Sequence, residues 1–313
     1  MTNNILLCFD SNYNTQAEVT IMSLLNNTFS KLSFFIIHSN PETTVGLSTR
    51  IKMHKNTEGL KVYKFKKRKG ITFPNFDESH MTEATYYRLF LSDYLPDEIN
   101  TIMYIDPDIV CINNFDILFQ TTFEILNKSE FILSARTEHY EKLNSETVQR
   151  LELSNQKYFN AGVTFINFKK WQENQLTEKL IQKMNYLNER VMWFDQDILN
   201  SQLDGMYNEI PLQLNFTNPL ITRDEIKEEA VFYHYSGKKK PWTMKGILEY
   251  GESFYQENYR AIFDGNYHIV HRYKKDSILH FMKFILSFKF MKLQKPLIFI
   301  FNFITSMKKP NNV

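Results

Sequence analysis

Two carboxylates, Asp106 and Asp108, stand two residues apart directly after an apolar run, Thr101 to Ile105. The run predicts a strand, and in an open α/β sheet ligands bind at the carboxyl ends of the strands. Paired carboxylates supply the hard oxygen ligands that Mg²⁺ and Mn²⁺ prefer. The pair therefore predicts a metal-bound phosphate site, although an isolated Asp-x-Asp is also compatible with an ordinary solvated turn.

Two clusters earlier in the chain suit a nucleotide or a phosphate. Asp10 and Asn12 can form hydrogen bonds and Tyr13 can stack on a base, although this segment alone is an ordinary turn before a helix. Arg88 stands in an apolar helical segment and could clamp a phosphate or a sugar hydroxyl. A surface salt bridge is the alternative role for this arginine.

Three later clusters add amides, carboxylates, an imidazole and lysines. Asn160 offers a donor and an acceptor beside small residues that let the backbone approach a ligand. The segment Trp193 to Asn200 contributes further polar groups. His234 precedes a glycine turn at Gly237 and a lysine-rich loop that includes Lys240 and suits a phosphate. A single histidine after an apolar strand also has a purely structural interpretation.

The elements that must position these clusters alternate between strands and helices. This alternation predicts an α/β fold with a mostly parallel, doubly wound sheet and right-handed crossovers. Strands are expected at residues 4–9, 32–38, 60–65, 101–105, 131–135, 163–168 and 231–234, and helices at 15–27, 41–55, 81–94, 176–187 and 196–201. We expect two halves of one domain, residues 1–125 and 126–262, and a tail at 263–313.

Composition agrees with a large folded core. The chain has 313 residues, of which 43% are hydrophobic and 15% aromatic, and two cysteines leave no disulfide framework or thiolate zinc site. The first residues lack a basic segment, so we expect no signal peptide and a cytoplasmic location. From Arg272 onward, nine Lys and Arg face one Asp, so the tail carries +8 and the remainder −6. This asymmetry argues against a nucleic-acid partner.

The basic tail is also rich in apolar residues. Ile278 to Leu293 interleaves aromatic and basic side chains, Pro296 is expected to end that helix, and Leu297 to Ile304 is apolar. The last run is far shorter than the roughly 20 residues needed to span a bilayer. The tail therefore predicts a helical anchor on an anionic membrane surface. A helix packed on the body, or one that forms a dimer, is the alternative.

Taken in this order, the six clusters resemble the retaining glycosyltransferases of family 8, above all the bacterial lipopolysaccharide and lipooligosaccharide α-galactosyl- and glucosyltransferases. The resemblance runs from the N-terminus to about residue 245. It implies a GT-A fold and a donor that is UDP-galactose or UDP-glucose. It also implies a bound Mn²⁺, with Mg²⁺ as the alternative, and a glycan or lipid-linked saccharide as acceptor.

The resemblance assigns roles to individual residues. Asp106, Asp108 and His234 match the metal ligands. The other positions that match contacts with the UDP-sugar are Asp10, Asn12, Tyr13, Arg88, Asn160, Asp195, Gln196, Gly237 and Lys240. His80, Thr85 and Trp193 match the acceptor side.

These roles imply a chemistry for the transfer. Lys240 would stabilise the departing UDP, which carries the developing negative charge. Gln196 matches the residue beneath the anomeric carbon, and an amide there favours attack from the same face as the leaving group. The diphosphate oxygen would accept the acceptor proton. Asp195 would orient the sugar or stabilise positive charge, and a transient covalent adduct is the alternative.

The chain departs from the family pattern in three places. Ser11 replaces an Asp, Pro107 fills the middle of the Asp-x-Asp, and the stretch Ser134 to Glu138 lacks an Asp that relatives place near the donor sugar. The last departure leaves galactose and glucose open. The sequence thus predicts a retaining hexosyltransferase at the inner face of the plasma membrane, acting on a bacterial surface polysaccharide or lipopolysaccharide. A non-catalytic nucleotide-sugar or glycan-binding module and a two-metal phosphoryl-transfer enzyme are the alternatives.

Overall fold

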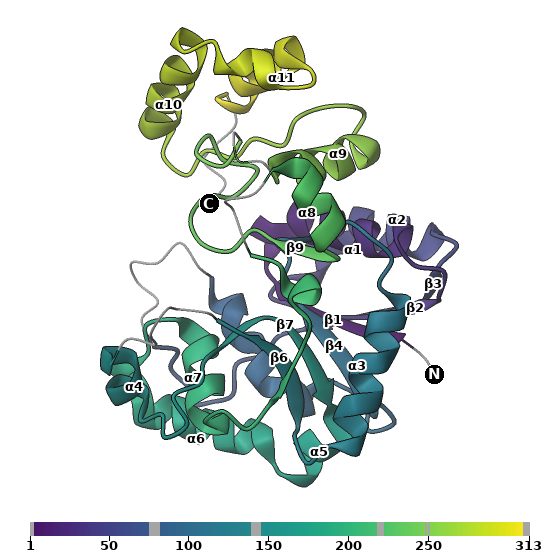
Figure 1. The fold of residues 1–313 in the computed structure, drawn as a ribbon, viewed down its shortest axis with the longest axis vertical. Helices are drawn as coiled ribbons and strands as arrows, with labels where there is room; N and C mark the ends of the chain where they lie inside the picture. The colour runs from purple at the N-terminus through teal and green to yellow at the C-terminus, as the bar shows by residue number, and fades with distance from the viewer. Residues whose placement is uncertain are drawn as a thin grey trace.

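A seven-stranded sheet forms the centre of the molecule in the computed structural model, which describes residues 3–74, 82–138, 145–217, 222–247, 249 and 251–308 (Figure 1). The strand order is β3-β2-β1-β4-β7-β6-β8. These strands are β1 (Asn3–Phe9), β2 (Leu32–His38), β3 (Thr57–Lys64), β4 (Thr101–Ile105), β6 (Leu133–Thr137), β7 (Phe159–Asn167) and β8 (Asn208–Glu209). The predicted α/β fold with a mostly parallel sheet is confirmed, because only the pairings of β7 with β4 and β6 are antiparallel.

The sheet is buried on both faces, and this explains its continuous apolar runs. Along β1, Ile5 and Leu7 point into one core and Leu6 and Cys8 into the other, as the two-residue period of a strand requires. One core takes its cover from α1 (Asn14–Asn26), α2 (Val45–Met53) and α3 (Asp116–Lys128). The other is covered by η3 (Glu83–Asp93), α5 (Phe168–Glu173), α6 (Leu176–Leu187) and α7 (Phe194–Leu203).

Several expected elements differ in type or extent. The helix expected at 81–94 is a 3₁₀ helix, η3, whose backbone leaves helical geometry at Phe90. The helix expected at 41–55 is divided into a 3₁₀ turn, η2 (Pro41–Thr44), and α2. Short elements that no pattern predicted complete the body, and they are η1 (Ser11–Tyr13), α4 (Ser145–Leu151), η4 (Asn188–Arg190), η5 (Leu212–Asn215) and α8 (Arg223–Glu229). The division of the chain at residues 125 and 262 stays a prediction.

A small two-stranded sheet joins the end of β4 to the C-terminal part of the chain. Its strands are β5 (Ile109–Cys111) and β9 (Phe232–His234), which run antiparallel with Ile109 opposite His234. The backbone N–H of Tyr235 donates to the Asp108 carbonyl at 3.1 Å. This pairing carries His234 to the segment that holds Asp106 and Asp108, although these residues are far apart in the sequence.

The C-terminal region lies beyond α9 (Glu252–Ile262) and consists of α10 (Lys274–Leu286), η6 (Lys289–Lys292) and α11 (Pro296–Ser306) (Figure 1). The expected helix from 278 to 293 is wrong in its extent, because Phe288 adopts a left-handed backbone conformation with φ 54° and α10 stops before it. Pro296 begins α11 rather than ending a helix, in agreement with the preference of proline for the first helical turn. No helix in the described residues has the length and apolar character needed to cross a membrane.

The start of α7 is held by a fully buried carboxylate. Asp197 pairs with Arg150 at 2.5 Å and accepts hydrogen bonds from the backbone N–H groups of Met192 and Trp193 at 2.7 and 2.8 Å. The hydroxyl of Tyr158 donates to the other carboxylate oxygen of Asp197 at 2.7 Å. Asp197 therefore fixes the segment that leads into the predicted site residues of α7.

We expect Asp197→Ala to lower the free energy of unfolding by about 3–5 kcal/mol, because the change leaves the buried Arg150 guanidinium without its partner. Urea-induced unfolding measures the change. Glu173→Ala is the matched control, since Glu173 forms an exposed pair with Lys169 at 4.0 Å and its loss should cost less than about 0.5 kcal/mol. Equal destabilisation by the two substitutions would contradict the assignment.

Candidate active site

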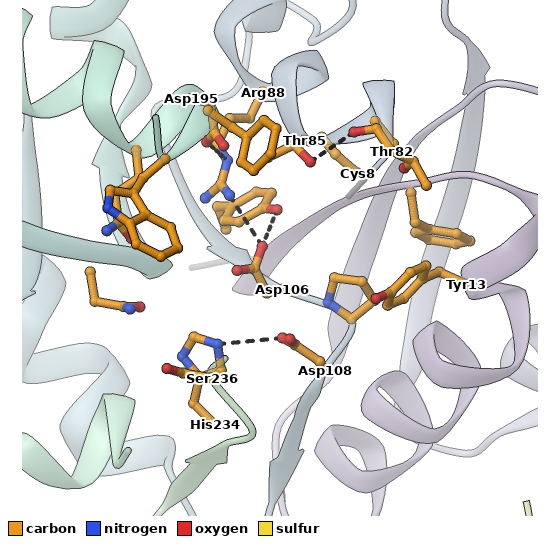
Figure 2. Close-up of a pocket in the computed structure, with 18 of the residues that line it drawn as sticks. Cys8, Tyr13, Thr82, Thr85, Arg88, Asp106, Asp108, Asp195, His234 and Ser236 are labelled. Carbon is orange, nitrogen blue, oxygen red and sulfur yellow. Dashed lines mark hydrogen bonds and ion pairs between the residues drawn. The ribbon is translucent and has the colours of Figure 1, made fainter. Parts of the chain in front are cut away.

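A cavity of about 310 Å³ opens at the carboxyl ends of β1 and β4 and is bordered by the start of β7 (Figure 2). Members of all six clusters line it. The predicted residues among the lining are Tyr13, Thr85, Arg88, Asp106, Asp108, Asn160, Trp193, Asp195, Gln196, His234, Gly237 and Lys240. The fold thus brings together most of the residues that sequence reasoning selected.

Two predicted residues lie elsewhere. The carboxylate of Asp10 caps η1 by accepting from the backbone N–H of Asn12 at 2.9 Å, and neither residue lines this cavity. Asn12 borders a second cavity beside the first. His80 lies outside the described residues.

Asp106, Asp108 and His234 form a group of metal-type ligands. Each offers one ligand atom, and these atoms all lie within 4.8 Å of one another. Asp108 Oδ1 is 3.4 Å from His234 Nε2 (Figure 2) and, within the described residues, has no hydrogen-bond partner. Whether this pair repels or attracts depends on which nitrogen of the imidazole carries the hydrogen.

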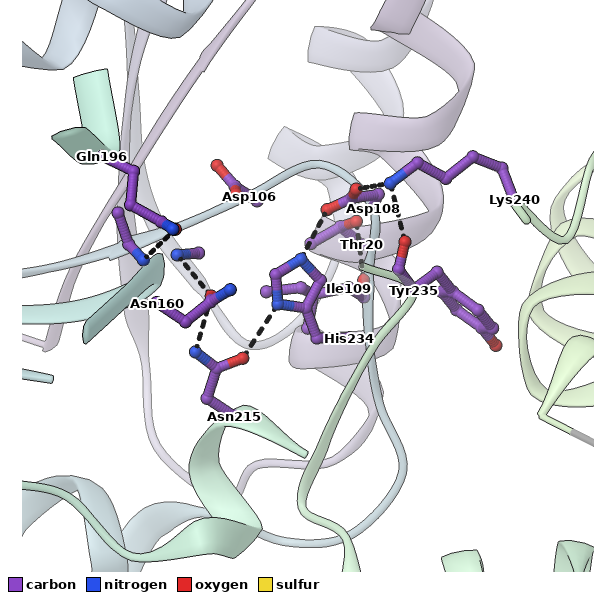
Figure 3. A network of polar contacts seen from close by, with 12 residues as sticks. Thr20, Asp106, Asp108, Ile109, Asn160, Gln196, Asn215, His234, Tyr235 and Lys240 are labelled. Atoms are coloured by element: carbon purple, nitrogen blue, oxygen red, sulfur yellow. Dashed lines mark hydrogen bonds and ion pairs between the residues drawn. The ribbon is translucent and has the colours of Figure 1, made fainter. Parts of the chain in front are cut away.

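A chain of side-chain amides decides that question (Figure 3). The backbone N–H of Gly162 donates to Asn160 Oδ1 at 2.9 Å, so this atom is an acceptor. Asn215 therefore turns its Nδ2 group toward Asn160 Oδ1, at 3.0 Å, and its Oδ1 toward His234 Nδ1, at 2.9 Å. Because an amide oxygen can only accept, His234 Nδ1 carries a hydrogen, and in the neutral ring Nε2 therefore presents its lone pair.

The lone pair of His234 Nε2 thus faces a carboxylate oxygen of Asp108. Two acceptors at this separation repel each other unless a cation lies between them. Two carboxylates and one imidazole are ligands that Mn²⁺ and related divalent ions accept. The donor set, the buried Asp108 oxygen and the fixed tautomer of His234 therefore fit a divalent cation.

Lys240 supplies a positive charge on the other side of Asp108. Its ammonium group bonds Asp108 Oδ2 and donates to the Tyr235 carbonyl at 2.6 Å (Figure 3). Burial alone would raise the pKa of Asp108, but the charge of Lys240 opposes burial, and that pKa lies below its usual range. The loop reaches this position through Gly237, whose φ of +79° suits glycine.

Arg88 is buried and bridges two carboxylates. Its guanidinium lies 2.5 Å from Asp195 Oδ2 and 3.2 Å from Asp106 Oδ1, bonds the Ala161 carbonyl, and stacks 3.8 Å over the Tyr104 ring. Burial raises the pKa of Asp195 to about 7, and it also raises the pKa of Asp106, although Arg88 opposes both shifts. The surface salt bridge considered for this arginine is not formed.

Gln196 is held on both sides of its amide. Its oxygen accepts from the backbone N–H of Ala161 at 2.9 Å, and its Nε2 donates to Tyr158 at 3.1 Å and to Glu138 at 3.4 Å. Glu138 also accepts from Asn160 at 2.8 Å. The other carboxylate oxygen of Glu138, Oε2, is buried and has no hydrogen-bond partner among the described residues. Glu138 therefore brings a carboxylate to the cavity from the stretch that lacks the expected Asp.

Sequence reasoning missed Tyr104, Glu138 and Asn215 as site residues. The hydroxyl of Tyr104 donates to Asp106 at 2.5 Å, but its position two residues before that aspartate, inside an apolar run, reads as core. Asn215 lies in η5, a segment with no predicted element. In the sequence, Asn215 is marked only as a polar residue among apolar ones. Its hydrogen-bond partners can be identified only from the fold.

We expect Gly162→Ala to weaken divalent-cation binding by about 10- to 100-fold, because the new β-carbon would lie 2.8 Å from His234 Nδ1 and displace the ring. Titration with Mn²⁺ measures the effect. Gly59→Ala is the control, since its β-carbon would meet Ser33 Oγ at an ordinary 3.6 Å. Unchanged Mn²⁺ affinity in Gly162→Ala would show that His234 does not depend on this contact.

Comparisons with known proteins identify the family of this chain. The family model described as glycosyl transferase family 8 matches residues 4–246. The chain is 28% identical over 258 residues to the lipopolysaccharide 1,2-glucosyltransferase of Escherichia coli, covering 77% of this chain and 73% of that protein. It is also 28% identical over 184 residues to the lipopolysaccharide 1,3-galactosyltransferase of Salmonella typhimurium, covering 56% and 54%.

A solved structure shares the fold. The galactosyltransferase LgtC, in complex with donor and acceptor sugar analogues, aligns with a TM-score of 0.67 and 19% identity. The alignment covers 82% of this chain and 95% of LgtC, so the GT-A fold is confirmed. Because the family model spans most of the chain, the protein belongs to glycosyl transferase family 8 and is a glycosyltransferase.

Proposed function

We propose that this glycosyltransferase moves galactose or glucose from a UDP-sugar to a glycan or lipid-linked saccharide, with retention of the anomeric configuration and with Mn²⁺ as the bound cation. The observation that supports the proposal most strongly is the meeting of a three-ligand metal group with Lys240 and Gln196 in one cavity. The alternatives considered from sequence, a binding module and a phosphoryl-transfer enzyme, become outcomes of the test below.

Departure of UDP places negative charge on the diphosphate, and the site holds positive charge where this charge would develop. A cation held by Asp106, Asp108 and His234 would neutralise part of it. Lys240 already reaches Asp108 Oδ2, so its ammonium group is available at the same edge of the cavity to donate to a phosphate oxygen. No separate general acid is needed for a leaving group stabilised in this way.

The groups near the predicted position of the sugar favour attack from the face of the leaving group. Gln196 is an uncharged amide whose oxygen is occupied by the Ala161 N–H. Asp195 is buried and paired with Arg88 at 2.5 Å, so it is less available as a free nucleophile. Asp195 would instead stabilise positive charge on the sugar. A covalent adduct on Asp195 remains the competing route, and it would require the Arg88 pair to open.

Glu138 is a candidate contact for the donor sugar. Its second carboxylate oxygen is buried at the cavity and has no partner within the described residues, so it can accept a hydrogen bond from a sugar hydroxyl. Galactose and glucose differ in the direction of one hydroxyl, and a fixed acceptor of this kind discriminates between them. The panel of donors below decides which sugar it accepts.

The acceptor is proposed from the relatives and from the tail. The similar Escherichia coli and Salmonella typhimurium proteins act on lipopolysaccharide by their names, and we place this chain in synthesis of a bacterial surface polysaccharide or lipopolysaccharide. The tail exposes large apolar side chains between lysines, including Leu286, Phe288 and Leu297, each more than 70% exposed. An apolar and basic surface of this kind suits peripheral binding at the inner face of the plasma membrane.

The function is tested by release of UDP from a panel of UDP-sugars with Mn²⁺ or with EDTA. We expect one hexose donor to be turned over only with the cation, and Asp108→Asn to reduce the rate by about 10²- to 10³-fold, because the change removes a metal ligand. Asp224→Asn, an exposed substitution on α8, is the matched control and should retain activity.

Two outcomes would contradict the function. UDP binding without turnover of any donor, with acceptor extracts present, would favour the binding module. Turnover of a phosphate ester without sugar transfer would favour the phosphoryl-transfer enzyme. Nuclear magnetic resonance of the product reports whether the anomeric configuration is retained.

The membrane proposal predicts that Phe288→Asp weakens binding of the full chain to vesicles that contain anionic phospholipid, because a charge at this exposed position opposes insertion of the apolar surface. Co-sedimentation measures the bound fraction. Phe29→Asp is the control, since Phe29 is 92% exposed but lies in the loop after α1, away from the tail. Equal binding of both variants would show that the tail does not contact the membrane.

A further inference from the structure

A second cavity lies beside the first and is larger, with a volume of about 680 Å³. It is bordered by the start of α1, the loop after β9, and the segment that leads into α10. It shares Tyr13, Gly237 and Lys240 with the first cavity. The metal ligands line only the first cavity.

Positive charge dominates the lining of this second cavity. Its charged residues are Lys238, Lys240, Lys245, Arg272, Lys274 and Asp276. Lys240 is directed to Asp108 in the first cavity, and Lys238, Lys245 and Arg272 contribute further positive charge to the second. A single carboxylate does not balance them, so the cavity has the charge of a site for an anion. Lysine and arginine side chains are well suited to bind phosphate.

Two buried side chains supply a second, independent observation. His271 is 5% exposed, and its Nε2 lies 2.7 Å from Ser306 Oγ. The Ser306 hydroxyl donates its hydrogen to the Phe303 carbonyl at 2.8 Å, so it accepts from His271 and Nε2 carries the hydrogen. His271 Nδ1 is then an acceptor, and within the described residues it has no partner.

Gln16 presents a second buried acceptor to the same cavity. It is 3% exposed, and its Oε1 has no hydrogen-bond partner among the described residues. Burial, and after it the charge of Lys274, lowers the pKa of His271, which agrees with a neutral ring. An unpartnered buried acceptor is costly, and both atoms would be satisfied by a ligand that donates hydrogen bonds.

We infer that this second cavity binds a phosphate ester that carries free hydroxyl groups. The phosphate would lie against Arg272 and the lysines, while hydroxyl groups would donate to His271 Nδ1 and Gln16 Oε1. A soluble polyol phosphate and the glycerol headgroup of a membrane phospholipid share this chemistry. The inference goes beyond the sugar transfer proposed above and does not depend on it.

The inference is tested by calorimetric titration of the full chain with sn-glycerol 3-phosphate, and with methyl phosphate as an ester without free hydroxyls, each in the presence and absence of excess UDP and Mn²⁺. A parallel arm measures binding to vesicles of phosphatidylglycerol and of phosphatidic acid. With UDP present, we expect the probe that carries free hydroxyls to bind about tenfold more tightly than its counterpart in at least one arm. The comparison is sn-glycerol 3-phosphate against methyl phosphate in the soluble arm, and phosphatidylglycerol against phosphatidic acid in the vesicle arm. The arm that responds identifies the soluble ester or the lipid as the source.

Variants assign the binding to the cavity. Arg272→Gln and His271→Phe should each weaken binding about tenfold, and Phe keeps a ring against Phe303. Lys275→Gln is the matched control, because Lys275 is exposed at the start of α10, three residues after Arg272, and does not line the cavity. Lys245→Gln, on an exposed loop position, tests the same cavity without disturbing the core, and circular dichroism checks that every variant is folded.

Three results would overturn the inference. The first is that neither arm shows binding. The second is that excess UDP abolishes the binding, which would place the ligand in the donor cavity. Equal weakening by Lys275→Gln would show a general attraction to the basic tail rather than a built site. Because binding is measured directly, a chain without transferase activity would still give a clear answer here.

Discussion

Three carboxylates, Asp106, Asp108 and Asp195, share one buried cavity, and their repulsion is the constraint on which the rest of the site depends. Arg88 neutralises two of them at once, and Lys240 pairs with the third. Such buried charges are tolerated only when every partner is in place. The remaining gap, where the His234 lone pair meets an oxygen of Asp108, is the place that the proposed cation would complete.

The fold meets this constraint by bringing four distant segments to one edge of the sheet. The parallel strand β4 delivers the two aspartates, and antiparallel β7 returns the Asn160 to Gly162 segment beside them. The short pairing of β5 with β9 then sets His234 against Gly162, which has no side chain to obstruct the ring. The amide chain through Asn215 finally orients the imidazole. Loss of the Asn215 contact would leave the buried Nδ1–H group of His234 without an acceptor.

Much of this could be predicted from the sequence. Strands buried on both faces appear as apolar runs, so the sequence predicts β1, β2 and β4, and with them the clusters that follow β1 and β4. Helix α3 was missed because Ile117 and Ile125 are 77% and 56% exposed, and this blurs its apolar period. Glu138 and Asn215 could not be predicted, because their partners are set by strand pairing and not by spacing. The break at Phe288 could not be predicted either, because a left-handed backbone conformation is uncommon for residues other than glycine.

The central claim is that His234 and the two aspartates hold one divalent cation. Electron spin echo spectroscopy of Mn²⁺ bound to protein with ¹⁵N-labelled histidine tests it most directly. We predict coupling to one imidazole nitrogen, and no such coupling in His234→Gln protein. Bound Mn²⁺ without nitrogen coupling, or coupling that persists in that variant, would contradict the claim.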